Sequence, residues 1–280
     1  MPAAPGAPAP PAAESDADLA ARLAVDAAAL ALTHFNGPQD WWDKSVGNPV
    51  SRADLEVDAF LKASLAEARP HDGWLSEETA DTTARLEKSR VWIVDPIDGT
   101  RDFVRGRSGW AVSIALVEAG QPLVAALAAP ARNQLFLAAL GQGATLNGQK
   151  LAVSTAPESL RLPIDPQNLD APFWPAPWPG GSLVEKPNSL ALRTAKIAAD
   201  EADAWLEGRT INEWDIAAAS LILTEAGGRI TDRHGQPLTF NKPAPLIHGL
   251  AAATPAHHAL TLDYLSHALA VFAAHRRAAS

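Results

Sequence analysis

Cysteine is absent from this chain of 280 residues, and its absence removes several kinds of chemistry. Disulfide bonds, thiolate nucleophiles and zinc or iron–sulfur centres held by cysteine are all excluded. No long apolar run is free of charges, which excludes a membrane span. Positive charge is scarce, because 23 Lys and Arg face 32 Asp and Glu and leave a formal net charge of −9. This balance disfavours a nucleic acid polymer as a partner, whereas a small anionic substrate is compatible where bound metal ions reverse the local field.

The remaining composition is that of an ordinary globular protein. Hydrophobic residues make up 47% of the chain and charged residues 20%, so the chain can bury a sizeable core. Residues 1–14 consist mainly of Ala, Pro and Gly and lack the basic and apolar regions of a secretory signal. We expect a disordered tail there and a cytoplasmic protein, and peripheral association with the inner membrane remains open.

Apolar spacing predicts helices first and a sheet after them. Residues 16–35 and 51–68 carry apolar residues at helical spacing, with Ser15 or Asp16 as the N-cap of the first helix. From residue 91 onward the chain changes to short apolar runs separated by tight turns, which favour antiparallel hairpins. The strands are expected at residues 91–94, 110–117, 122–129 and 134–139. Helices followed by a meander indicate an α+β fold.

A Pro-rich stretch, residues 160–187, separates this pattern from a second set of elements. We interpret it as a linker or an irregular crossover. The tryptophans of residues 172–181 either form a ligand platform or hold the loop on the body of the protein, and the second reading is favoured. The later elements are expected as helices at 189–199, 216–226 and 257–275 and strands at 204–206, 229–231 and 250–253.

One segment concentrates oxygen ligands at the end of an expected strand. In Trp92-Ile-Val-Asp-Pro-Ile-Asp-Gly-Thr100, Asp95 follows the apolar run and Asp98 stands three residues later. Pro96 stiffens the turn, and Gly99 permits a positive φ or the close approach of another group. If a helix begins near Asp98, its free N–H groups can receive a phosphate. Two carboxylates and a carbonyl in one turn suit Mg²⁺, although Asp-Pro and Asp-Gly are also common turn formers.

Two further acidic positions favour the metal hypothesis. Glu77 and Glu78 follow the second helix and a turn, and Asp215 follows Trp214 at the start of an apolar helix. The alternatives are that the two glutamates form a solvated pair and that Asp215 caps the helix. Lys44 is either a counter-charge for the acidic site or an ordinary loop lysine.

Together these segments resemble a known family. The combination of Glu77-Glu78, Asp95-Pro-Ile-Asp-Gly-Thr100, Trp214-Asp215-Ile-Ala-Ala and Glu225-Ala-Gly-Gly228 is similar to that of the inositol monophosphatase-like superfamily of Mg²⁺-dependent, lithium-sensitive phosphatases. The order and spacing match over nearly the whole chain after residue 16. Softer features include Arg101-Asp-Phe103 and Ser189-Leu-Ala-Leu-Arg193, and they most resemble the 3′(2′),5′-bisphosphate nucleotidases of the bacterial CysQ type.

The resemblance implies a fold and a division of the chain. The expected fold is an α+β, layered α/β/α/β/α sandwich of the inositol monophosphatase and fructose-1,6-bisphosphatase type, with metals between two halves. Residues 15–157 would form an α+β half that binds metal. Residues 158–280 would form an α/β half that completes the active site.

The resemblance also implies roles for individual residues and two, or with a weak third site three, Mg²⁺ ions. The expected metal ligands are Glu77, Asp95, the Ile97 carbonyl, Asp98 and Asp215. The expected catalytic residues are Glu77, Thr100 and Asp54, of which Asp54 lies near the weaker third metal. The expected substrate-binding residues are Asp98, Gly99, Thr100, Ser189 and Asp215. The chain departs from the family pattern at Asn188-Ser189, where Gly-Ser or Gly-Thr is common, and at Ser51, where Thr is usual.

The implied reaction is the hydrolysis of a phosphate monoester by direct attack of water, without a phosphoenzyme. Mg²⁺ neutralises the phosphoryl oxygens and lowers the pKa of a bound water, and Glu77 with Thr100 orients and deprotonates the attacking water. The leading substrate is adenosine 3′,5′-bisphosphate, with its sulfated precursor as a second nucleotide, which indicates sulfur assimilation. The alternatives are an inositol-1-phosphate or broad sugar-phosphate phosphatase and, from another class, a non-catalytic regulator that binds metal or nucleotide. The partner is thus a small phosphorylated metabolite, and a homodimer is compatible with this assignment.

Overall fold

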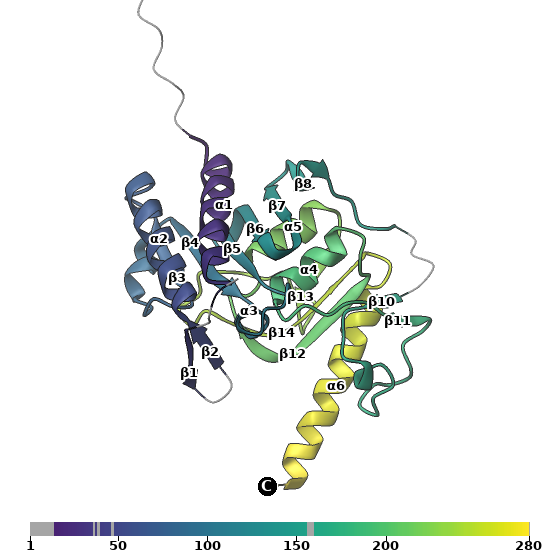
Figure 1. The fold of residues 1–280 in the computed structure, drawn as a ribbon. Coiled ribbons are helices and arrows are strands. Elements are labelled where there is room, and N and C mark those ends of the chain that lie inside the picture. The colour runs from purple at the N-terminus through teal and green to yellow at the C-terminus, as the bar shows by residue number, and fades with distance from the viewer. Residues whose placement is uncertain (1–13, 36, 38–39, 46–47, 156–159, 280) are drawn as a thin grey trace, which may run out of the picture.

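The computed structural model describes residues 14–35, 37, 40–45, 48–155 and 160–279, and these residues form five layers (Figure 1). Two helices, α1 and α2, cover the outer face of a large sheet, and α4 and α5 lie between that sheet and a smaller one. The helix α6 packs on the outer face of the smaller sheet. The expected α/β/α/β/α sandwich is confirmed. Nearly all of the tail expected at residues 1–14 lies outside the described residues.

The helices begin and end close to the predicted positions. Their bounds are α1 Asp16–Phe35, α2 Arg52–Ala68, α3 Thr100–Val104, α4 Leu190–Ala198, α5 Ala217–Glu225 and α6 His258–Ala279. Local signals explain this agreement. The Ser15 hydroxyl accepts from the Asp18 backbone at 3.1 Å, and Ser51 and Asp54 form a reciprocal capping box at the start of α2.

The large sheet has seven strands in the order β3-β4-β5-β6-β7-β8-β9. The strands are β3 Gly73–Ser76, β4 Arg90–Asp98, β5 Ala111–Glu118, β6 Gln121–Ala129, β7 Gln134–Ala139, β8 Gly143–Leu146 and β9 Gln149–Lys150. The first two strands are parallel, and every later neighbour is antiparallel, as the predicted meander requires. Successive residues alternate between two cores, since Trp92 packs with α1 and α2 while Ile93 packs with α4 and α5. Helices on both faces therefore fix the register of β4, which carries Asp95 and Asp98.

One prediction about this half needs correction, and two others become more definite. The strand expected to stop at Val94 continues through Pro96 to Asp98, because its pairing with β5 is interrupted between Asp95 and Asp98 and the missing proline N–H is not needed there. The helix expected near Asp98 is α3, a single turn that begins at Thr100. Before α2, the described residues form a hairpin of β1 (Trp41–Ser45) and β2 (Asn48–Ser51).

The smaller sheet, β12-β14-β13, supplies the other side of the molecule. Its strands are β12 Ala204–Asn212, β13 Arg229–Asp232 and β14 Leu246–Ala253, and they pair antiparallel. The predicted strand at 204–206 was too short, since β12 runs on to Asn212. Between the halves, β10 Leu160–Leu162 and β11 Gly181–Leu183 pair in parallel. Trp178 is buried, and its ring lies 4.0 Å from that of Tyr264 on α6, so this tryptophan holds the Pro-rich segment on the body of the protein.

Candidate active site

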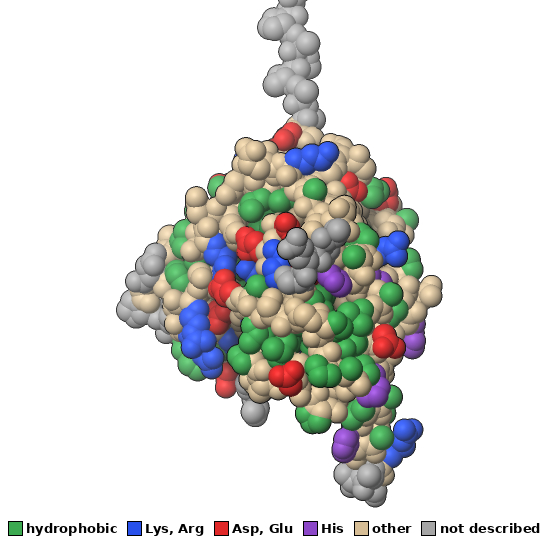
Figure 2. All heavy atoms as spheres, turned by 90° about the vertical axis from the view of Figure 1, so that its right-hand side faces the viewer, with side chains coloured by type: hydrophobic (Ala, Val, Ile, Leu, Met, Phe, Trp, Pro, Cys, Tyr) green, Lys and Arg blue, Asp and Glu red, His purple; other side chains and the backbone are tan. Residues whose placement is uncertain are grey.

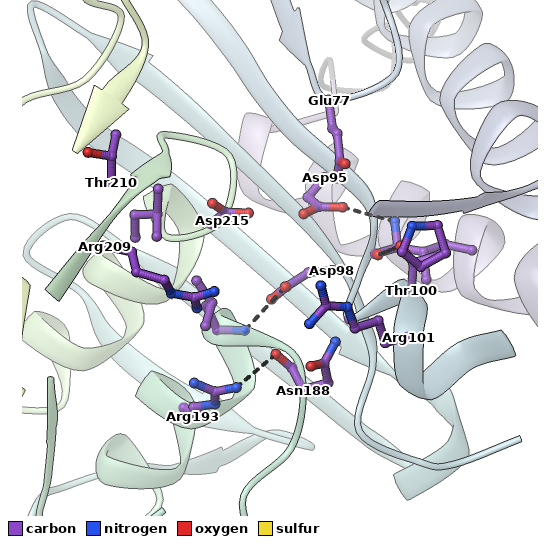
Figure 3. Close-up of a pocket in the computed structure, with 15 residues that line it drawn as sticks. Glu77, Asp95, Asp98, Thr100, Arg101, Asn188, Arg193, Arg209, Thr210 and Asp215 are labelled. Atoms are coloured by element: carbon purple, nitrogen blue, oxygen red, sulfur yellow. Dashed lines mark hydrogen bonds between the residues drawn. The ribbon is translucent and has the colours of Figure 1, made fainter. Parts of the chain in front are cut away.

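Three aspartates from distant parts of the chain converge on one pocket (Figure 3). Asp95 and Asp98 come from the end of β4, and Asp215 precedes α5, where its carboxylate accepts from the Asn212 backbone at 2.8 Å. One carboxylate oxygen from each lies within 4.8 Å of the other two. The helix-cap alternative for Asp215 is wrong, because the residue at the start of α5 is Ile216 and no side chain caps it.

Burial and mutual repulsion make this cluster electrostatically unfavourable in the metal-free protein. Burial, and then the charges of Glu77, Asp98 and Asp215, raise the pKa of Asp95 well above its ordinary value. Burial and the charge of Asp98 do the same to the pKa of Asp215. The pKa of Asp98 rises to about 6, chiefly through burial, although hydrogen bonds from Ser189 and the start of α4 oppose the shift. Three carboxylates held together in this way are stabilised by a cation.

Glu77 approaches the same pocket from the loop after β3 (Figure 3). The Lys44 ammonium of the β1–β2 hairpin lies 3.3 Å from Glu77 Oε1 and also donates to Glu78 Oε1. Of the two alternatives for Lys44, a counter-charge for the acidic site therefore holds, and an ordinary loop lysine does not. Glu78 is 4% exposed, so the two glutamates are not a solvated pair, and burial raises the Glu78 pKa to about 7. On the other side of this loop, Asp58 of α2 accepts from the hydroxyls of Ser76 and Thr79 and holds the loop in place.

Asp54 and Thr100 form a second polar group beside the aspartates. The Thr100 hydroxyl lies 3.2 Å from Asp54 Oδ1 and 3.0 Å from the Ile97 carbonyl oxygen. Asp54 also accepts from the Ser51 backbone at 2.8 Å and from the Ser51 hydroxyl. Burial raises the pKa of Asp54 to about 6. The hydroxyl that usually belongs to Thr in the family is thus present in Ser51 and fixes Asp54.

Gly99 allows the two halves of the molecule to approach at this point. Its φ of +96° lies in the left-handed region, and a Cβ at this position would lie 2.6 Å from the Gly109 carbonyl oxygen and 2.9 Å from the Ser189 nitrogen. Both neighbours are backbone atoms that bond to each other, since Ser189 donates its N–H to the Gly109 carbonyl at 2.9 Å. Glycine is therefore required here for the conformation and for the close approach.

Asp98 joins β4 to the start of α4. Its carboxylate accepts from the Ser189 hydroxyl, from the Leu190 backbone at 3.2 Å and from the Ala191 backbone at 2.8 Å. Ser189 is the N-cap of α4, where its hydroxyl accepts from the Leu192 backbone. These bonds satisfy N–H groups that a helix terminus leaves open, and they place Asn188 beside the pocket.

Arginines line the side of the pocket away from Glu77 (Figure 3). Arg101 and Arg209 point into it, and Arg193 lies below, where it is 8% exposed. Arg193 donates to the Pro187 and Asn188 carbonyls and lies 5.6 Å from the centre of the Trp205 ring. Sequence reasoning did not assign these arginines to the site. Arg101 and Arg193 stood in segments quoted for the family resemblance, whereas nothing in the sequence around Arg209 indicates a role.

The donor set fits a magnesium site. Asp95, Asp98 and Asp215 provide only carboxylate oxygens and form no salt bridge with a Lys, Arg or His of the described residues. The pocket has a volume of about 250 Å³ and also contains Glu77 and Ile97, so all five expected ligands border one space. Hard oxygen donors with room for water are the environment that Mg²⁺ prefers.

The comparisons with known proteins point to one family. Residues 13–170 and 181–269 match the model of the inositol monophosphatase family. A Streptomyces griseus protein named glucose-1-phosphate thymidylyltransferase is 38% identical over 79% of this chain and 87% of its own length. The histidinol-phosphatase of Mycobacterium tuberculosis is 34% identical over 72% of this chain and 81% of its own. Among solved structures, an IMPase of Thermotoga maritima has a TM-score of 0.77 and 26% identity, covering 90% of this chain and 97% of that one.

Proposed function

Because the chain belongs to the inositol monophosphatase family, we propose that it is a Mg²⁺-dependent phosphatase that removes the 3′-phosphate of adenosine 3′,5′-bisphosphate, as a CysQ-type bisphosphate nucleotidase does. Its sulfated precursor is a second substrate of the same shape. The observation that carries the proposed chemistry is the convergence of Asp95, Asp98 and Asp215 within 4.8 Å. A protein that only binds nucleotide has no need for three buried carboxylates at that spacing, because they destabilise its metal-free fold.

In this proposal Glu77, Asp95, the Ile97 carbonyl, Asp98 and Asp215 hold two Mg²⁺ ions. When bound, the ions supply Lewis acidity: they withdraw charge from the phosphoryl group, make water a better nucleophile and stabilise the leaving oxygen. The chain supplies the frame for these ions. Three ligands come from β4, one from the loop after β3 and one from just before α5, and β3, β4 and α5 all pack into the two cores.

Thr100, with Glu77, positions the attacking water. The Thr100 hydroxyl can donate to only one acceptor at a time, and both Asp54 Oδ1 and the Ile97 carbonyl are within reach. Its oxygen thus has lone pairs directed away from these acceptors, where a water can donate to it. Glu77 is the acceptor for the second proton of that water, and Asp54 keeps Thr100 in its orientation. Gly99 and Thr100 bring the backbone close to the phosphate.

A second candidate is hydrolysis of inositol 1-phosphate or of a range of sugar phosphates. The likeness to the Thermotoga IMPase favours it, since that neighbour covers 90% of this chain. The chemistry would be the same, and only the group that leaves would differ. Asn188 is relevant to the choice, because it replaces the glycine common in the family and borders the pocket on the side of the leaving group.

A substrate panel tests the proposal. Phosphate release is measured from adenosine 3′,5′-bisphosphate, inositol 1-phosphate, fructose 1,6-bisphosphate and histidinol phosphate, with Mg²⁺, with chelator and with added Li⁺. We expect the nucleotide to have the highest kcat/KM and chelator to abolish turnover. Comparable kcat/KM values for all substrates would reject the nucleotidase assignment. No release from any of them, or a trapped phosphoenzyme, would reject the proposed chemistry.

A further inference from the structure

A second cavity adjoins the carboxylate pocket and shares a wall with it. The cavity measures about 840 Å³, compared with about 250 Å³ for the pocket of the aspartates. Arg101, Asn188, Arg193, Arg209 and Thr210 line both spaces, so the two lie side by side. A phosphate held at the aspartates therefore leaves the rest of its molecule facing the larger space. That volume is in the range of small-molecule sites, about 300–1,000 Å³.

Aromatic rings form the far wall of this cavity. Phe173 and Trp174 come from the Pro-rich segment, and Phe272 comes from the outer part of α6. The Phe173 ring centre lies 4.5 Å from that of Trp174 and 5.1 Å from that of Phe272. Trp174 is held in place by its indole N–H, which donates to the Asn168 carbonyl. Apolar side chains gather on the face of the molecule that bears α6 (Figure 2).

Positively charged side chains also line this cavity. Its two acidic lining residues, Asp165 and Glu207, already pair with Lys186 and Arg209. Arg233 and Arg276 also line it, and neither forms a salt bridge or hydrogen bond with any described residue. The cavity thus combines an aromatic wall with two uncompensated positive charges, in a protein whose net charge is −9.

We propose that this cavity binds the part of the substrate that is not hydrolysed, with a heteroaromatic base against Phe173, Trp174 and Phe272 and a second phosphate at Arg233 or Arg276. The assignment rests on the proposed function, because it takes the reacting phosphate to lie at the aspartates. Bases stack on aromatic side chains whatever their sequence, and guanidinium groups pair with phosphate oxygens. An inositol or hexose ring offers no aromatic face to this wall, so the cavity selects nucleotides over the polyols that other substrates of this chemistry carry.

Substitutions in the cavity wall test this assignment. Phe272→Ala is the first variant, because Phe272 is 44% exposed and its loss should leave the fold intact. Trp174→Leu and the double variant Arg233→Gln/Arg276→Gln probe the other two features, and Arg22→Gln on α1 is the control for loss of an exposed positive charge. The quantity measured is the kcat/KM for adenosine 3′,5′-bisphosphate divided by that for inositol 1-phosphate.

We expect this ratio to fall about tenfold in Phe272→Ala and Trp174→Leu, the lower part of the range for one stacking contact, and to stay unchanged in Arg22→Gln. In the double arginine variant it should fall while the same ratio for adenosine 3′-monophosphate falls less. A ratio that stays constant in all cavity variants would overturn the assignment, and so would an equal fall for both substrates.

A binding measurement separates this inference from the proposed function. Calorimetry of adenosine 3′,5′-bisphosphate with Asp95→Asn, in the presence of Mg²⁺, measures the affinity for the nucleotide in a variant that does not hydrolyse it. We expect binding that Phe272→Ala in the same background weakens about tenfold. If the wild-type protein released phosphate from inositol 1-phosphate but the nucleotide did not bind, the cavity assignment would fail and the phosphatase would stand. If the nucleotide bound in this way but no substrate were hydrolysed, the proposed function would fail and the cavity assignment would stand.

Discussion

Replacing Asp95 with Asn should abolish turnover and at the same time stabilise the metal-free protein. Asp95 is 1% exposed, and its neighbours Asp98 and Asp215 carry the same charge. Asparagine has nearly the same shape and keeps an oxygen that can accept from the Ile97 backbone, as Asp95 Oδ1 does at 3.1 Å. The substitution thus removes repulsion at little loss of packing or hydrogen bonding.

The size of the effect follows from the neighbouring carboxylate. Asp98 has a pKa of about 6 in the folded chain against an ordinary value of 3.8, a difference that corresponds to about 3 kcal/mol of folding free energy at pH 8. Asparagine at position 95 removes a second buried charge, that of Asp95 itself, together with its repulsion by Asp98 and Asp215, so we expect a gain of the same order, about 1–3 kcal/mol. For a chain of this length, 1 kcal/mol is about 2 °C in Tm, so the expected rise is roughly 2–6 °C.

Thermal unfolding at pH 8 in chelator measures this rise, and phosphate release measures the loss of turnover. Asp203→Asn is the matched control, because Asp203 is also fully buried but its carboxylate pairs with Arg161 at 2.8 Å. Breaking that pair should lower Tm, since it removes the buried partner of Arg161 and leaves only the exposed Asp200. Mg²⁺ should raise the Tm of the wild type more than that of Asp95→Asn. A lower Tm for Asp95→Asn in chelator would refute the reasoning, as would retained activity at saturating Mg²⁺.

Three further outcomes follow from the same site. In chelator, the free energy of unfolding should fall as the pH rises from about 4 to 7. The folded-state pKa of Asp98 lies above its unfolded value, so the folded protein binds more protons over that range. A Tm that rises between pH 4 and 7 would contradict this. Lys44→Met should lower the Mg²⁺ concentration for half-maximal activity several-fold, because the lysine ammonium competes with Mg²⁺ for the Glu77 carboxylate. An unchanged Mg²⁺ titration curve would rule out that competition. Gly99→Ala should lower the free energy of unfolding by at least 2 kcal/mol and reduce kcat, because its Cβ would meet two backbone atoms. Denaturant titration and phosphate release measure the two effects. Wild-type values in both would show that the backbone can shift to accommodate the Cβ.

The parts of the fold that the sequence predicted are those with local causes. The bounds of α1 coincide with the prediction because a capping serine and apolar spacing specify them within a few residues. The meander was predictable because its separators are too short for crossovers. The approach of Asp95 and Asp215 is of another kind: no local pattern brings residues 120 positions apart together, and the expectation depended on the resemblance to a family.

The features that were missed depend on tertiary contacts. β4 continues past Pro96 because a break in its pairing with β5 tolerates the missing N–H, and the sequence does not reveal that break. The sequence left two interpretations of Lys44 open, because nothing local shows that the short hairpin carries it to Glu77. Trp174 and Trp178 share one Pro-rich segment, yet Trp178 is buried against α6 while Trp174 lines a cavity. Only the packing separates their roles.

Asp98 is part of the acidic cluster and also of the N-terminus of α4, so the two cannot change independently. Its carboxylate is the terminal acceptor for α4 as well as a member of the acidic cluster. A cation that draws on this carboxylate therefore also acts on the first turn of α4, and through it on Asn188, which lines the pocket. Binding of a cation at the acidic cluster and the position of Asn188 are in this sense coupled. A substitution at position 98 would therefore disturb the start of α4 and the acidic cluster together.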